Sequence, residues 1–471
     1  MRRDELQGLA TPAGIFDAFT GPGGGAARRR FQELFEVVAL PGERLHGALR
    51  EGDVVIQRAL GEGSLARRTA IEAATIRDFA PGARLPFDRL VLRPASRAGG
   101  EALESDLAER TLPFGDAAAT AISPFSEKLY PTGMDPAAAH NARLSAALQT
   151  VRGTLAPANR TRLDKAAILV CKLVPRPAVL EYAGVRELDM FFSASLLKVS
   201  LLYASFELVA RVNKVAPLLT AGGAPAFFAK VKQTFDGKIA GAVPDITPGA
   251  WRKTKFDAAL TATASVAGVF SVRMSDLHRR DLESIFFDQL QNAGARDCIH
   301  RLGFSYINGA LAAAGFFGPV TQLGIWLASD FISDAPPAPG NWPSFYVPVS
   351  TGGKSSLAMT ALSMAHLLSL IFREELIDAA SSRDMRAIFA RGLAWLSTLP
   401  NPNAFSFETT GAKVGHESSD TAKVGSVMSE AAFLRRKTDG AQFVAVWQNV
   451  PDPLGAEPIY RVIDEVVRTW P

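Results

Sequence analysis

The chain has 471 residues, of which 48% are hydrophobic, enough for a sizeable core in two domains or in one large domain with insertions. The net charge of +4 comes from basic residues scattered along the sequence, which excludes a dedicated nucleic-acid surface and leaves a globular protein. Two cysteines and six histidines without ligand spacing exclude a disulfide framework and a cysteine-based zinc site, so we expect no metal and no cofactor.

Residues 1–125 differ in pattern from the rest of the chain. A glycine-rich basic segment at 21–30 precedes a short predicted helix and two strand-like runs within 31–59. Residues 95–135 are rich in alanine, glycine, proline and acidic side chains, and this composition is typical of a linker. We therefore expect a small β-containing module with its linker at 1–125 and a second, larger domain at 126–471.

One apolar stretch, Phe191 to Val212, is long enough for a membrane-spanning helix. It contains Lys198, Glu207 and several serines, which favours a buried helix of a large domain, so we expect no stable membrane span. The first residues, MRRDELQGLATP, lack the apolar core of a secretory signal peptide. The expected location is therefore cytoplasmic, with non-classical export as the alternative.

The remaining elements predict an α+β fold. Asp135 as N-cap and Pro136 at the first helical position indicate a helix over 135–153, and an amphipathic pattern predicts a closing helix over 459–470. The predicted strands are 166–174, 178–183, 426–436 and 441–449. About 200 mostly helical residues separate the two pairs of strands. This order suits an antiparallel sheet covered by the terminal helices on one face and by a helical subdomain on the other.

Ser195 and Lys198 stand near the start of the apolar stretch, three residues apart and therefore on one face of a helix. An amine in that position can accept the proton of the hydroxyl and convert it into a nucleophile. The N-terminal end of a buried helix also presents unpaired N–H groups, which favour a developing oxyanion. The alternative is a chance pairing, because a Ser-x-x-Lys sequence is expected about once by chance in a chain of this size.

The sequence resembles the serine β-lactamase and penicillin-binding protein superfamily over roughly residues 135–471. Ser195 and Lys198 correspond to the family's first motif, Ser-x-x-Lys. Its second motif, Ser-x-Asn, corresponds to Leu290 to Asn292, so the resemblance gives Asn292 the substrate-carbonyl role and leaves leucine in place of the serine.

A competing register for the second motif runs from Ser305 to Asn308, in which Ser305 or Tyr306 supplies the missing hydroxyl and Tyr306 becomes a substrate-binding residue. We prefer the first register, because Ile307 and Asn308 fit better in the helix that follows.

The third motif, Lys-[Thr/Ser]-Gly, has two candidates, Lys413-Val-Gly415 and Lys423-Val-Gly425. Both have valine in place of the hydroxyl residue that anchors a substrate carboxylate in the family. We prefer Lys413, because residues 415–424 then form the turn to the next strand. In this register Gly415 lines the cleft, and the backbone N–H of His416 pairs with that of Ser195 as the oxyanion hole.

The resemblance also bears on turnover. Class A β-lactamases carry Arg-Trp-Glu on a loop, whose glutamate activates the water that hydrolyses the acyl-enzyme. Residues 322–327 fall at a similar distance and keep Trp326, but leucine, Leu327, replaces the glutamate. Asp330 is the nearest carboxylate that could substitute for it. We therefore expect a long-lived acyl-enzyme.

Two functions follow from these motifs. One is a serine hydrolase or acyltransferase that forms an acyl-enzyme on Ser195 with a small-molecule or peptide substrate, such as a β-lactam or a peptidoglycan-stem peptide. The other is a degenerate binding or structural protein that has kept the fold and lost catalysis. A buried amine without a partner costs several kcal/mol, so retention of Lys198 in an apolar helix favours the enzyme.

Overall fold

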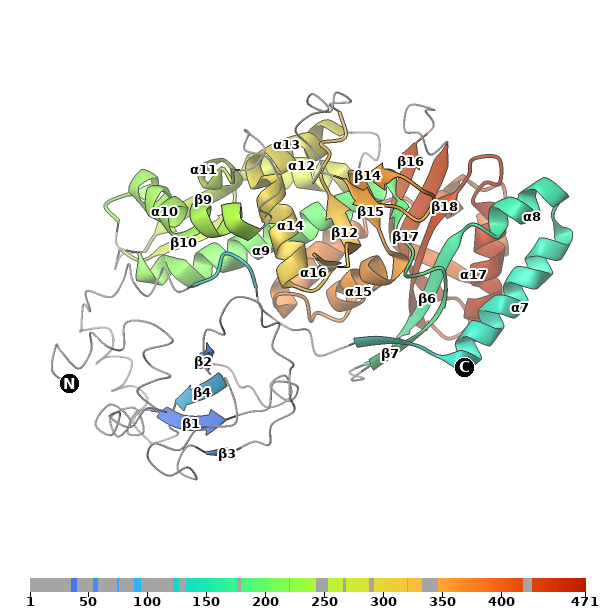
Figure 1. Ribbon diagram of the computed structural model, residues 1–471, viewed down its shortest axis with the longest axis horizontal. Coiled ribbons are helices and arrows are strands. Elements are labelled where there is room, and N and C mark those ends of the chain that lie inside the picture. Colours follow the sequence, from blue (N-terminus) through green and yellow to red (C-terminus); the bar gives the residue numbers. More distant parts are fainter. Residues whose placement is uncertain are drawn as a thin grey trace. The chain divides into compact units, whose positions relative to one another are not determined.

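The structure is a computed structural model that divides into two units, residues 1–122 and 123–471 (Figure 1). Four strands are described in the first unit. They form a sheet in the order β2-β4-β1-β3, with β1 (Phe35–Ala39), β2 (Val54–Gln57), β3 (Ala74–Thr75) and β4 (Arg89–Pro94). β1 and β2 lie within residues 31–59, the segment in which the sequence indicates two strand-like runs. From residue 122 on, the structure describes 122–126, 133–175, 179–219, 221–242, 253–265, 268–287, 292–319, 321–332, 346–417 and 426–471.

The second unit is built on a six-stranded sheet in the order β16-β17-β18-β6-β7-β5. Its strands are β5 (Gly133–Pro136), β6 (Ala167–Leu173), β7 (Val179–Val185), β16 (Phe407–Glu417), β17 (Val427–Arg436) and β18 (Gln442–Val450). Neighbouring strands pair antiparallel, except that β5 runs parallel to β7. The predicted hairpin and the two C-terminal strands are confirmed.

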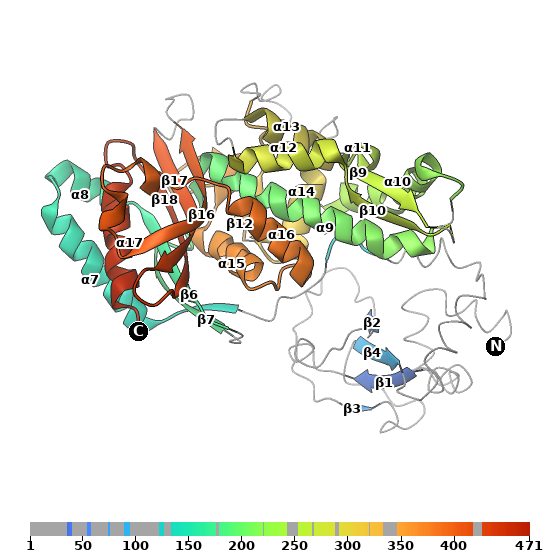
Figure 2. The ribbon, with the colours of Figure 1, turned by 180° about the vertical axis from the view of Figure 1, so that it is seen from behind.

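The terminal helices cover one face of this sheet, as predicted (Figures 1 and 2). They are α7 (Ala138–Thr154), α8 (Pro157–Leu163) and α17 (Glu457–Thr469). Trp447 of β18 and Tyr460 of α17 lie in the core between sheet and helices, both almost fully buried. α15 (Ala361–Phe372) packs on β6 and β18, and α16 (Ala379–Phe389) packs on α15. The predicted α+β class, an antiparallel sheet between terminal helices and a helical part, is confirmed.

The start of α7 differs from the prediction. The helix begins at Ala138, while Asp135 and Pro136 belong to β5, where they pair with Glu181 and Tyr182 of β7. The expected N-cap was wrong because strand pairing takes up these residues, and the helix begins without a side-chain cap.

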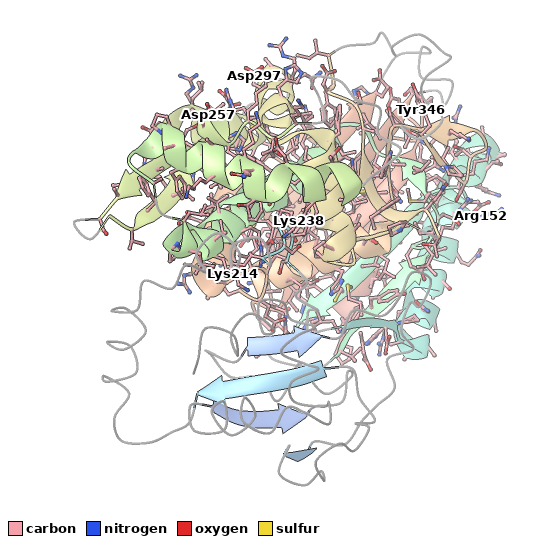
Figure 3. The ribbon with its side chains drawn as sticks, turned by 60° about the vertical axis from the view of Figure 1, so that its left-hand side comes forward. Arg152, Lys214, Lys238, Asp257, Asp297 and Tyr346 are labelled. Atoms are coloured by element: carbon pink, nitrogen blue, oxygen red, sulfur yellow. The ribbon has the colours of Figure 1, made fainter. Side chains whose placement is uncertain are left out.

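The helical part lies away from the terminal helices (Figure 1), and Figure 3 labels Arg152 of α7 at the right of the view and Lys238 of α10 near its middle. Its helices are α9 (Val199–Val215), α10 (Ala224–Ala242), α11 (Phe256–Ala259), α12 (Asp276–Phe287), α13 (Asn292–Leu302) and α14 (Phe304–Ala313), with the hairpin β9 (Leu260–Ala264) and β10 (Phe270–Met274). A small sheet in the order β11-β12-β15-β8 comprises β8 (Phe191–Phe192), β11 (Phe317–Gly318), β12 (Leu323–Leu327) and β15 (Leu357–Met359). The remaining short elements are β13 (Val347–Pro348), β14 (Lys354–Ser355) and the 3-10 turns η3 (Ala216–Leu218), η4 (Trp395–Thr398) and η5 (Pro402–Ala404).

The apolar stretch from Phe191 to Val212 is not a single helix. It begins as strand β8, continues as a 3-10 turn, η2 (Ala194–Lys198), and becomes α-helical only at Val199. Among the described residues, no helix is both long and apolar enough to cross a membrane.

Both cysteines are free and buried. Cys171 lies in β6 and Cys298 in α13, so the two thiols belong to different parts of the unit. Burial raises the pKa of the Cys171 thiol to about 12 and also raises that of Cys298.

Candidate active site

Ser195 lies in η2, the short turn between β8 and α9. Its side chain is half-buried, whereas Ala194, Leu196 and Leu197 around it are buried. The turn is closed by the N–H of Leu196, which donates to the carbonyl oxygen of Ser193 at 3.1 Å. Ala194 has a φ of 47°, a left-handed conformation that costs energy for any residue with a Cβ atom. The only partly accessible residue of the turn is thus the proposed nucleophile.

Lys198 ends the same turn and is fully buried. Its Nζ donates to Oδ1 of Asn292 at 2.5 Å and lies 4.9 Å from the centre of the Phe331 ring. Burial lowers the pKa of Lys198 to about 8, because an ammonium loses hydration in the interior. Asn292 is the first residue of α13, so the structure brings the first two predicted motifs into direct contact.

Lys413 lies on β16 and is also fully buried. Its pKa is lowered to about 7, first by burial and then by the positive charge of Lys198. Its Nζ donates to the carbonyl oxygen of Val414 at 3.2 Å. Two amines that titrate near neutral pH therefore share one site. The alternative residue, Lys423, lies outside the described residues.

Gly415 brings β16 into contact with the turn that carries Ser195. A Cβ atom at this position would lie 2.4 Å from the carbonyl oxygen of Ser193 and 2.8 Å from the backbone nitrogen of Leu196. Both distances are shorter than any real contact of a Cβ atom, so only glycine allows this approach. This close approach lets the edge strand β16 pack directly against the backbone of η2.

The His416 side chain is partly exposed. Its Nε2 lies 3.0 Å from Oδ1 of Asp452, and its ring meets the edge of Trp395 at 5.8 Å. The role predicted for its backbone N–H, as half of an oxyanion hole, stays a prediction.

Tyr306 is not brought to this site. It is fully buried in α14, its ring lies 5.6 Å from that of Phe125, and burial together with Glu207 raises its pKa well above the usual value. Substrate has no access to a side chain in this position, so the assignment of Tyr306 as a substrate-binding residue is corrected.

The competing register of the second motif is also wrong. Asn308 is fully buried, and its amide bonds the backbone of Leu327 in both directions, donating at 2.7 Å and accepting at 3.1 Å. The Asn308 side chain joins α14 to β12, and its amide groups are already used in these hydrogen bonds, so it cannot bind a substrate. Leu290, which stands in place of the family's serine in the preferred register, lies outside the described residues.

The segment compared with the water-activating loop is a strand. Residues 323–327 form β12, which pairs with β15, and Trp326 is buried there. Asp330 follows in a loop rather than one helical turn on, is buried, and lies 3.7 Å from Nε2 of His300. Within the described ranges, no carboxylate forms an ion pair with Lys198.

Sequence reasoning missed two features of the site. Phe331 covers the amine of Lys198, and Ser193, Ser429 and Gln448 form a buried polar group beneath the turn. The signal for the second feature was present, because serine and glutamine interrupt apolar strand sequences in SVMSEAAF and FVAVWQN. Metal-binding clusters of three or more histidine, cysteine, aspartate or glutamate side chains are not found in the described part of the chain.

No family model matches the chain, and neither does any curated protein. Solved structures similar to it include a β-lactamase from Chitinophaga pinensis, with 15% identity over 70% of this chain and 97% of that one and a TM-score of 0.37. The structure of PBP-A has 17% identity, covers 71% and 97% of the two chains, and gives a TM-score of 0.38. The TLA-3 extended-spectrum β-lactamase has 12% identity, covers 69% and 97%, and gives a TM-score of 0.40. The roles of individual residues therefore rest on the contacts described above.

Proposed function

We propose that the second unit is a serine acyl-transfer enzyme of the β-lactamase and penicillin-binding protein type, which forms an acyl-enzyme on Ser195. The observation that carries the proposal is the buried amine of Lys198, bonded to Asn292 and close enough to Lys413 for their charges to interact. These groups come from three elements, η2, α13 and β16, and Lys198 shares its turn with the half-buried Ser195.

In the proposed step, Oγ of Ser195 attacks the carbonyl carbon of an amide or ester while the neutral amine of Lys198 takes the hydroxyl proton. The oxyanion accepts hydrogen bonds from the backbone N–H groups of Ser195 and His416. The intermediate then expels the amine or alcohol, which receives the proton back from Lys198, and the acyl group remains on Ser195 as an ester. Atoms and charge balance without a metal or cofactor.

The lowered pKa of Lys198, about 8, supports its assignment as the base. A general base works best when its pKa lies near the operating pH, because an appreciable fraction is then neutral and still able to hold a proton. A lysine at its ordinary value of 10.5 would be almost entirely protonated at pH 7. Burial, which costs folding energy, thus prepares the amine for this role.

Phe331 supports a long-lived acyl-enzyme. Its ring lies over the amine of Lys198, with 4.9 Å between Nζ and the ring centre, and an apolar ring in this position supplies no base that could activate water. The described residues offer Lys198 no acidic ion-pair partner, and loss of a general base typically costs about 10² to 10⁴ in rate. Transfer of the acyl group to an amine, or its slow release, fits this site better than rapid hydrolysis.

The second candidate function is a binding protein that has kept the fold and lost catalysis. The observation that favours it is Val414, which stands between Lys413 and Gly415 where the family has a hydroxyl for the substrate carboxylate. In that case the cleft would hold a ligand without reacting with it.

Incubation with a fluorescent penicillin, followed by intact-mass measurement and peptide mapping, distinguishes these functions. The enzyme gains the mass of one penicillin, the label maps to Ser195, and Ser195→Ala abolishes it. Ser200→Ala, which changes a buried serine of α9 bonded to Leu197, serves as the matched control and keeps the label. Saturable binding without a mass shift would instead support the binding protein.

A further inference from the structure

Three buried polar side chains lie beneath the turn that carries Ser195. Ser193 precedes the turn, Ser429 comes from β17, and Gln448 comes from β18. Each is at most 1% exposed. Polar groups are rarely placed in such positions unless all of their hydrogen bonds are satisfied, so their partners indicate what they hold.

Gln448 uses both ends of its amide to join the main sheet to the small one. Its Oε1 accepts from Oγ of Ser193 at 2.6 Å, and its Nε2 donates to the carbonyl oxygens of Met359 at 3.1 Å and Asp189 at 3.4 Å. Met359 lies in β15, the strand that pairs with β8 immediately before the turn. Gln448 therefore fixes both the residue before Ala194 and the strand beside it.

Ser429 holds the same turn through its backbone. Its Oγ donates to the carbonyl oxygen of Ser193 at 2.9 Å and lies 3.5 Å from the carbonyl oxygen of Gly415. The Ser193 carbonyl also accepts from the N–H of Leu196, so it is held from two directions. The Ser193 carbonyl oxygen therefore contacts the turn through Leu196, the sheet interior through Ser429, and the edge strand β16 at Gly415.

Ala194 explains why such a support is needed. It lies between Ser193 and Ser195 with a φ of 47°, a conformation that persists only where the surroundings impose it. Without the bonds from Gln448 and Ser429, the chain would relax toward ordinary values and rotate Ser195 away from its present place. A displacement of about 1 Å at a reacting atom can cost 10²-fold in rate.

We propose that Gln448 and Ser429 are positioning residues for the nucleophile: they hold the Ser193–Ala194 turn in its left-handed conformation and so fix Ser195 beside Lys198. This inference rests on the proposed function for its kinetic consequence, but the ordering of the turn has a consequence of its own that requires no substrate.

Gln448→Met and Ser429→Ala test the inference, because each removes hydrogen bonds with little change in volume. Gln442→Met is the matched control on the same strand, where the Gln442 side chain donates to the nearby Gly440 carbonyl oxygen. Ser382→Ala is the control for the buried serine, since Ser382 of α16 donates to the carbonyl oxygen of Leu376, which precedes that helix. All four variants are measured for penicillin acylation over a range of penicillin concentrations and for unfolding in denaturant.

The rate constant of acylation at saturating penicillin should fall roughly 10- to 100-fold in Gln448→Met and Ser429→Ala. The concentration for half-saturation should stay within about twofold, and the two controls should acylate as the wild type does. A merely structural role would lower the unfolding midpoint and leave the acylation of the folded fraction unchanged. Unchanged acylation in both test variants would therefore overturn the inference.

Hydrogen exchange separates this inference from the proposed function. If the wild type is not acylated at all, the proposed function fails, and the exchange rates of the amides from Ser195 to Lys198 still report on the turn. They should rise at least 10-fold in Gln448→Met relative to Gln442→Met. Equal exchange in these two variants would show that Gln448 does not hold the turn.

Discussion

Replacing Lys198 with methionine should make the protein more stable and nearly inactive. The side chain is fully buried, and lowering its pKa from 10.5 to about 8 corresponds to roughly 3 kcal/mol for holding the ammonium in the folded protein at neutral pH. Methionine fills the same space without the charge. Loss of the hydrogen bond to Asn292 costs about 1 kcal/mol, so we expect a net gain of about 2 kcal/mol at pH 7.

The pH dependence of this gain follows from the two pKa values. In the unfolded chain the amine keeps its proton up to about pH 10.5, whereas in the folded protein it loses it near pH 8. Between these values the unfolded state binds more protons, so the wild type gains stability as pH rises. The advantage of Lys198→Met is therefore full below about pH 8 and shrinks as pH rises toward 10.5.

Denaturant unfolding of the wild type and Lys198→Met at pH 7 and pH 9.5 measures both effects, and penicillin labelling measures activity. Acylation of the variant should fall about 10²- to 10⁴-fold. In the wild type the acylation rate should rise with pH through the range of the coupled Lys198 and Lys413 titrations, near pH 7 to 8. Equal labelling of variant and wild type would remove Lys198 from the mechanism, and a less stable variant would show that the contacts of the amine outweigh the cost of burying it.

Four further outcomes are expected. Gly415→Ala should lower the free energy of unfolding by about 1–3 kcal/mol and remove most of the acylation, because its Cβ atom would meet backbone atoms. Gly153→Ala, which has open space at its Cβ atom, should lose neither stability nor acylation, and equal denaturation midpoints for the two variants would contradict the close packing at Gly415. Burial raises the pKa of Glu430 to about 8, so between pH 4.5 and 8 the folded protein binds more protons than the unfolded chain. The free energy of unfolding of the wild type should therefore fall by up to about 1.4 kcal/mol for each unit by which the pH rises in this range, and denaturant unfolding of Glu430→Gln should not show this slope. Thiol titration should find Cys171 and Cys298 unreactive in the native protein and both reactive after unfolding without a reductant; a Cys171–Cys298 crosslink in non-reducing peptide maps would refute the architecture. A chromogenic cephalosporin should give a single burst of product, because the acyl-enzyme on Ser195 is expected to be long-lived. Steady multiple turnover that Ser195→Ala abolishes would show that water has access to the acyl-enzyme.

Much of the sheet was predictable from local patterns. The runs 166–174 and 441–449 are apolar on both faces, which is typical of central strands, and turn residues mark their ends. The closing helix shows a clear apolar face. In these elements the apolar faces that the local sequence specifies are the faces that the structure buries, so prediction and structure coincide.

The errors share one physical cause, which is that tertiary contacts override local preference. Asp135 and Pro136 have the pattern of a helix start, but parallel pairing with β7 recruits them into a strand. The apolar stretch from Phe191 predicts one helix, yet β15 draws its first residues into a sheet and leaves a strained turn at Ala194. Tyr306 matched a motif in sequence, but its helix turns it into the core.

The candidate site was predictable where a residue's type dictates its chemistry. Ser195 and Lys198 were singled out because their side chains match a reaction, and Asn292 and Lys413 because they match the motifs of the resembled family. The structure brings the two lysines and Asn292 together. Gln448 acts through the backbone it holds, so the sequence marks it only as a polar residue in an apolar strand and does not tell what it bonds.

The central pairing of the sheet, between β6 and β18, joins residues 167–173 to 442–448. The chain segment between them is long, so closing it costs conformational entropy before the contact returns any stability. During synthesis, β6 and β7 emerge early and must wait for the last strands as partners. The support beneath Ser195 has the same dependence, because its bonds to Gln448 and Ser429 span 255 and 236 residues. The turn that carries Ser195 should therefore be among the last parts of the protein to become ordered. If Ser195 is the nucleophile, a nascent chain that stops short of β17 should carry an intact Ser-x-x-Lys sequence that does not react.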